Sequence, residues 1–197
     1  MTKRNLALTL AVGLGLGASL AIARPAVAQE HAHQHMAMPT SGLRAELIRD
    51  VEQLEQKYVG LAEAMRGKYG WRPADGVRSV SEVFMHVAAA NFTMPSMAGI
   101  QPPRAEELPA PPRELEKVTD EAKVLEVLKH SFMHARHAIA RVPDAELEAA
   151  VNLFGREATK RAVFMTIVTH MHEHLGQLIA YARMNGVTPP WSAGASD

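Results

Sequence analysis

Two histidines late in the chain, His170 and His174, have the spacing of a pair of metal ligands. They lie four residues apart in the run HMHEHLGQ, which places both imidazoles on one face of a helix, about 40° apart around its axis. Imidazoles so placed can hold one divalent metal ion without distorting the helix. The alternative interpretation is a pair of hydrogen-bonded core or surface histidines. Gln177 and Tyr181 continue the same row and are candidates to orient a ligand or a bound group.

The residues between the two histidines do not form a zinc-protease motif. In the His-Glu-x-x-His motif the glutamate directly follows the first ligand, whereas here Glu173 directly precedes His174. His172 projects from the opposite side of the helix and is expected in solvent. Glu173 is the nearest candidate general base.

A third histidine, His86, interrupts the apolar run VFMHVAAA. Alone, such a residue is more often a hydrogen-bonded core histidine, but a His-x-x-x-His pair on another helix makes it a candidate third ligand. Three neutral imidazoles leave one coordination position open, as a catalytic metal requires. A water or thiol bound there becomes more acidic and acts as a nucleophile near neutral pH. Asn91 and Trp71 are expected at the mouth of such a site.

A further group of histidines, His130, His134 and His137, shares one face of a predicted helix at spacings of four and three. They flank the apolar stripe of that helix rather than lie in it. A solvated edge is therefore the favoured interpretation, and a second metal site is the alternative.

The segment 29–40 is rich in histidine and methionine, lacks a helical period and is predicted to be a flexible tail. Cleavage before Gln29 would place His31 third in the new chain, where a free amine, two amides and the imidazole can bind Cu(II) or Ni(II) in a square plane. The alternative is a polar leader whose N-terminal glutamine has cyclised. The auxiliary ligands in this hypothesis are His33, His35, Met36 and Met38.

Four amphipathic helices are needed to position these residues. Apolar residues recur at spacings of three and four from Leu43 to about Met65, and three further helices are expected over about 79–91, 119–142 and 159–185. The second begins at a capping box, Ser79-Val80-Ser81-Glu82. Residues 144–158 are a connection with a short helical turn. No period-two pattern predicts a strand.

The connection over residues 93–118 carries six prolines, which exclude a regular helix and mark a long crossover. The short link between the first two helices favours antiparallel neighbours, and the crossover lets the second and third helices run parallel. The predicted fold is therefore an all-α four-helix bundle with up-down-down-up order.

These residues resemble the DinB/YfiT-like superfamily over about 41–192. The resemblance is carried by the tryptophan-bearing turn Trp71-Arg72-Pro73, the capping box leading to His86, the crossover, and His170-x-x-x-His174-Leu175-Gly176-Gln177 with Arg183. It implies a four-helix bundle in which His86, His170 and His174 hold a divalent metal, usually zinc or nickel. It also implies a frequent homodimer and, in characterised relatives, transfer or isomerisation reactions that use low-molecular-weight thiols.

The first 28 residues are predicted to be a signal peptide. Lys3 and Arg4 precede an apolar run, and Ala26-Val27-Ala28 provides small residues for cleavage after Ala28. The alternative is an uncleaved anchor. Removal leaves 18 basic and 21 acidic residues, a net charge of −3, which gives no reason to expect nucleic acid or an anionic membrane as partner. Since the chain has no cysteine, disulfides and thiolate ligands are excluded.

The expected domains are the signal peptide 1–28, the tail 29–40, the bundle 41–192 and a short tail 193–197. The expected protein is periplasmic or secreted and acts as a metal-dependent transferase or hydrolase on a small molecule. A thiol substrate is put in doubt by export, because those thiols work in the cytoplasm. The alternative is a non-catalytic protein that binds a metal or a small ligand.

Overall fold

The computed structural model describes residues 38–192, so the predicted signal peptide and the tail histidines lie outside the described residues. Four long helices make up most of this part of the chain, and short 3-10 helices and one hairpin connect them. The elements are α1 (Gly42–Ala64), α2 (Val80–Thr93), η1 (Met94–Ala98), η2 (Ala105–Glu107), η3 (Pro112–Lys117), α3 (Glu121–Arg141), η4 (Asp144–Glu146), β1 (Ala150–Leu153), β2 (Arg156–Thr159), α4 (Lys160–Met184) and η5 (Pro190–Ser192). None of the helices within residues 38–192 has the length and apolar character needed to cross a membrane.

Helices α2, α3 and α4 each begin after a residue whose side chain caps the first turn. The predicted capping box of α2 is present: the Ser79 hydroxyl accepts from the Glu82 amide at 3.3 Å, and the Ser79 amide donates to the Glu82 carboxylate at 2.6 Å. Helix α3 begins at Glu121 instead of at about residue 119, because the Asp120 carboxylate caps it by accepting from the Lys123 amide at 2.9 Å.

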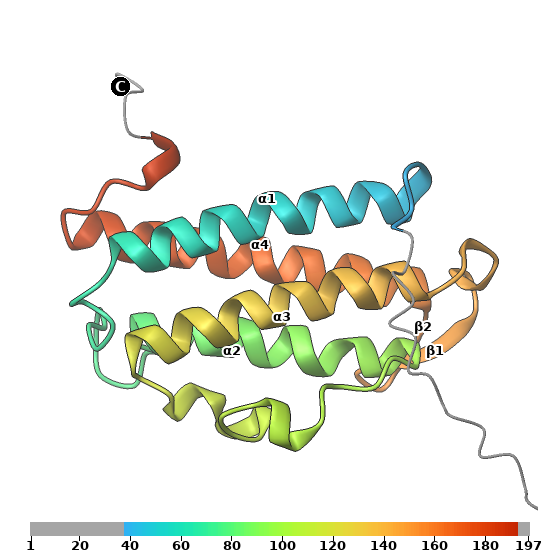
Figure 1. Cartoon of the computed structure of the whole chain (residues 1–197), viewed down its shortest axis with the longest axis horizontal. Coiled ribbons are helices and arrows are strands. Elements are labelled where there is room, and N and C mark those ends of the chain that lie inside the picture. Colours follow the sequence, from blue (N-terminus) through green and yellow to red (C-terminus); the bar gives the residue numbers. More distant parts are fainter. Residues whose placement is uncertain (1–37, 193–197) are drawn as a thin grey trace, which may run out of the picture. The chain divides into compact units, whose positions relative to one another are not determined.

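The helices form the predicted bundle, in which α2 and α3 run parallel to each other and antiparallel to α1 and α4 (Figure 1). Polar contacts between helices at the two ends of the bundle agree with this order. The Gly67 amide after α1 donates to Glu121 at the start of α3, and Arg44 at the start of α1 pairs with Asp144 beyond the end of α3.

Helices α1 and α2 are antiparallel but are not the neighbours that the sequence suggested. Each packs against both α3 and α4, so the two lie diagonally opposite in the bundle. The link over residues 65–79 is long enough to cross the end of the bundle. In the centre, the buried ring of Tyr58 lies 6.3 Å from Phe84 of α2 and 5.2 Å from Phe132 of α3, measured between ring centroids.

The connection between α3 and α4 differs from the prediction. The expected helical turn is present as η4, but residues 150–159 form an antiparallel hairpin in which Leu153 pairs with Arg156. Each strand has four residues, too few to produce a recognisable period-two pattern. The two-residue turn Phe154-Gly155 has positive φ at both positions, 52° and 83°, as a type I′ turn requires.

Phe154 is strained in this turn, because the left-handed conformation costs a residue other than glycine about 1–2 kcal/mol. Asparagine tolerates that conformation and is favoured before glycine in type I′ turns. We therefore expect Phe154→Asn to raise the free energy of unfolding by about 1 kcal/mol, measured by urea denaturation. Phe154→Ala, which removes the same ring but keeps the strain, is the matched control. Equal stability of the two variants would contradict this account.

Candidate metal centre

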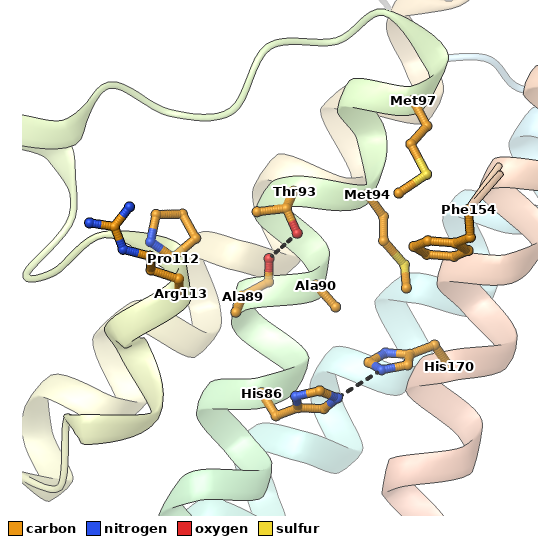
Figure 2. A pocket seen from close by; sticks show the side chains of 10 residues that line it. All are labelled: His86, Ala89, Ala90, Thr93, Met94, Met97, Pro112, Arg113, Phe154 and His170. Atoms are coloured by element: carbon orange, nitrogen blue, oxygen red, sulfur yellow. Dashed lines mark hydrogen bonds between the residues drawn. The ribbon is translucent and has the colours of Figure 1, made fainter. Parts of the chain in front are cut away.

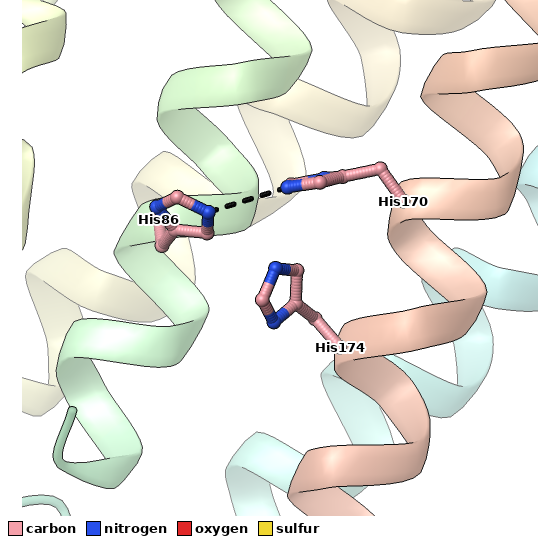
Figure 3. A group of neighbouring side chains, drawn as sticks. All are labelled: His86, His170 and His174. Carbon is pink, nitrogen blue, oxygen red and sulfur yellow. Dashed lines mark hydrogen bonds between the residues drawn. The ribbon is translucent and has the colours of Figure 1, made fainter. Parts of the chain in front are cut away.

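Three histidines from two helices meet on one side of the bundle. His86 comes from α2, and His170 and His174 come from successive turns of α4, so that all three rings turn toward one another (Figure 3). One nitrogen from each ring lies within 4.8 Å of the others. The structure thus brings together the three residues predicted as metal ligands, and their coordination of a metal stays a prediction.

The spacing of these nitrogens suits a single metal ion. Nε2 of His86 lies 3.2 Å from Nε2 of His170, and two ligands of a tetrahedral zinc ion with bonds of 2.0–2.1 Å would lie roughly 3.3 Å apart. The three rings are half-buried and the donor set is all nitrogen, which suits zinc, nickel or copper and does not suit calcium or magnesium. The residues present therefore fit the metal that the resemblance implies.

Glu116 fixes the orientation of His86. Its Oε1 lies 2.9 Å from Nδ1 of His86, and its Oε2 accepts from Nε of Arg78 at 2.9 Å. A proton on Nδ1 leaves the lone pair of Nε2 directed at the other two histidines. This carboxylate–imidazole arrangement is typical of metal-binding histidines. Sequence reasoning did not identify Glu116, which lies in η3 of the crossover; η3 packs along α2 and so brings the carboxylate to the site.

A second set of hydrogen bonds orients His174. Its Nδ1 lies 2.8 Å from Oε1 of Gln177, and the Gln177 amide nitrogen donates to the Tyr181 hydroxyl at 2.9 Å. Trp71 packs edge-on against the Tyr181 ring, with 5.3 Å between centroids. Tyr181 is only 5% exposed, so its hydroxyl supports Gln177 instead of facing a substrate. Trp71 is not among the residues that line the cavity beside the histidines.

The surroundings keep two of the imidazoles in the form that binds metals. Burial, together with the neighbouring His174, His86 and Arg78, lowers the pKa of His170 to about 4. Burial also lowers the pKa of His86, and Glu116 opposes that shift. A group with a pKa below neutrality is uncharged at pH 7, so the lone pairs of these two rings are available without loss of a proton.

A cavity of about 340 Å³ adjoins the histidines (Figure 2). His86 and His170 lie at one end of it, and Met94, Met97 and Phe154 form an apolar wall. Small-molecule sites are mostly apolar hollows of this size with a few polar groups placed in them. The arrangement therefore combines a candidate metal site with room for a small ligand beside it.

The remaining predicted site residues lie elsewhere. Asn91, expected at the mouth, is fully buried between α2 and α3, where its side-chain amide donates to the Ser131 hydroxyl at 3.2 Å. That prediction was wrong because the last turn of α2 carries Asn91 to the core side of the helix. His172 is exposed as expected, with Nε2 3.3 Å from an Asp50 oxygen. Glu173 is exposed and outside the histidine cluster.

The three histidines of α3 were the alternative candidates for a second metal site. Within residues 38–192, none of them belongs to a group of three metal-binding side chains. His137 is exposed, but His130 and His134 are half-buried against the ring of Phe92, at centroid distances of 5.3 and 5.7 Å. Burial, and to a smaller extent His130, lowers the pKa of His134 to about 4. The expected solvated edge is therefore only partly solvated.

Comparisons with known proteins place the same segment in one family. A sequence profile of the DinB superfamily matches residues 43–178. A DinB-like protein from Bacillus subtilis superposes with a TM-score of 0.56 at 19% identity, covering 73% of this chain and 93% of that one. A DinB-like protein from Bacillus cereus ATCC 10987 gives 0.56 at 20% identity, covering 72% and 89%. A search of proteins with curated functions found no significant match.

Proposed function

The chain belongs to the DinB superfamily, and we propose that His86, His170 and His174 hold one divalent metal ion. The observation that carries this proposal is the convergence of three imidazoles, with one nitrogen of each within 4.8 Å of the others, beside a cavity that His86 and His170 line. Zinc and nickel are the proposed ions, because both accept an all-imidazole donor set.

The residues around the cluster have separate tasks in this proposal. When bound, the metal supplies Lewis acidity at a coordination position that the three histidines leave open. Glu116 accepts hydrogen bonds from Nδ1 of His86 and Nε of Arg78, while Oε1 of Gln177 accepts a hydrogen bond from Nδ1 of His174. Both contacts hold the imidazoles in the tautomer that presents Nε2.

We assign the protein as a transferase or hydrolase that acts on a small molecule. The cavity beside the cluster supports this assignment, because a purely structural metal site would need no space for a second reactant. A thiol is one class of reactant, though export would separate the protein from the cytoplasmic thiols. A non-catalytic role in binding a metal or a small ligand is the second candidate, and the His- and Met-rich residues 29–40 favour it.

Export to the periplasm or the medium and formation of a homodimer are part of the same proposal. The sequence of residues 1–28 supports export. N-terminal sequencing of the secreted protein should begin at Gln29, and sedimentation should give twice the mass of the processed chain. Retention of residues 1–28 would overturn the first proposal, and a monomer at micromolar concentration would overturn the second.

Removal of the metal tests the proposed site. Free metal at one hundred times its Kd stabilises a folded protein by about 2.7 kcal/mol, which corresponds to a rise in Tm of roughly 5–10 °C for a domain of this size. We expect this rise with zinc or nickel and its reversal by a chelator, followed by turnover in a screen of thiol-transfer, ester and amide substrates. Metal content far below one per chain and an unchanged Tm would contradict the proposal.

A further inference from the structure

We infer that the cavity beside the histidines binds a small, uncharged molecule with an apolar body, and that Phe154 is the residue that selects it. This inference rests on the proposed metal site, because the polar end of the molecule is held there. It concerns the part of the ligand that the histidines do not reach.

The wall of the cavity offers apolar contacts almost throughout. Its lining residues are His86, Ala89, Ala90, Thr93, Met94, Met97, Pro112, Arg113, Phe154 and His170. The hydroxyl of Thr93 already donates to the Ala89 carbonyl at 2.8 Å. The guanidinium of Arg113 points away from the histidines in Figure 2 and lies 3.6 Å from the Glu114 carboxylate. Among the lining residues, the imidazoles are therefore the polar groups placed to meet a ligand.

Phe154 completes this wall, and its backbone there is strained. Its backbone is left-handed, with φ of 52°, and its side chain is 58% exposed. Neither burial in the core nor turn propensity explains a phenylalanine at this position. Strained residues of this kind occur where the side chain has a function. The hairpin turn places the ring at the cavity beside Met94 (Figure 2), since η1 packs against β1.

The size and chemistry of the cavity define the ligand class. At about 30 Å³ for each water-sized unit, the 340 Å³ cavity accommodates on the order of ten non-hydrogen atoms. Methionine sulfur and a phenyl ring favour an aromatic or alkyl body. A highly hydroxylated or charged molecule would lose its hydration there without finding partners.

Two probes that share one metal-binding group test the inference. Acetohydroxamate and benzohydroxamate differ by a phenyl ring in place of a methyl group. Their Kd values are measured calorimetrically on the full-length, metal-loaded protein. We expect benzohydroxamate to bind at least tenfold more tightly, and Phe154→Asn to reduce this ratio to about twofold without changing the Kd of acetohydroxamate. Met184→Ala, which alters a 63% exposed methionine of α4, is the matched control and should leave the ratio unchanged.

A preference for benzohydroxamate that survives both Phe154→Asn and Met94→Ala would overturn the inference. A metal-free arm separates this outcome from failure of the metal site. Benzyl alcohol, which lacks a chelating group, should shift the NMR signal of the Met94 methyl group in the metal-free protein, and Phe154→Asn should abolish the shift. If the same protein fails to take up added zinc or nickel, this shift would support the cavity, and the failed uptake would refute the metal site. No shift, together with equal hydroxamate affinities, would refute the cavity.

Discussion

His170→Ala and His174→Ala are each expected to abolish stoichiometric metal binding while the helical content stays within a few per cent of the parent. Each substitution removes one of three converging imidazoles. Two remaining ligands hold a divalent ion too weakly to survive dialysis. The bundle persists because both rings are only half-buried and the core of Tyr58, Phe84 and Phe132 is untouched.

His172→Ala is the matched control for this prediction. It removes an imidazole from the same turn of α4, but its side chain is 51% exposed and faces Asp50 of α1. Its metal content, measured by elemental analysis after dialysis, should equal that of the parent. Equal metal loss from His172→Ala and His174→Ala would mean that the wrong face of α4 had been assigned. The tail histidines are common to all these variants, so the difference between them isolates the cluster.

Glu116→Ala is expected to weaken metal binding by about 10- to 100-fold. The substitution removes the acceptor of the His86 Nδ1 proton and leaves the Arg78 guanidinium without the carboxylate that neutralises it. Burial acts to raise the pKa of Glu116, but the hydrogen bonds from Arg78 and His86 outweigh it, so the pKa is lowered overall and the carboxylate is charged at neutral pH.

Competition with a chromophoric chelator would measure this change in affinity. Glu114→Ala is the matched control, since Glu114 lies in the same 3-10 helix and pairs with Lys117 at 3.4 Å instead of with a histidine. Glu116→Gln should fall between the two, because its amide oxygen still accepts a hydrogen bond but carries no charge. A Glu116→Ala affinity equal to that of Glu114→Ala would exclude a role for this carboxylate in the site.

The sequence predicted the bundle because its signals are local. Spacings of three and four mark the buried face of each long helix, and the Ser79–Glu82 capping box is complete within one turn. The pairing of His170 with His174 is local in the same way. The addition of His86 needed the assumption that a histidine in an apolar run has a partner on another helix.

The parts that the sequence did not predict depend on contacts between distant segments. Glu116 is one of several acidic residues in the crossover, and only the packing of η3 along α2 distinguishes it from Glu114. The placement of Asn91 was wrong because a helical period cannot separate a buried polar residue from one at the edge of a site. The hairpin was missed because its turn has Phe154 before Gly155, where an asparagine or aspartate usually marks a type I′ turn.

X-ray absorption of the zinc-loaded protein tests the central claim most directly. The measurement is made on full-length protein in which His31, His33 and His35 are replaced by alanine, loaded with one equivalent of zinc. We expect three imidazole nitrogens at about 2.0–2.1 Å and one further ligand that is not an imidazole. A shell with fewer than three imidazoles, or one that is unchanged in His170→Ala, would contradict the assignment of His86, His170 and His174 as the metal site.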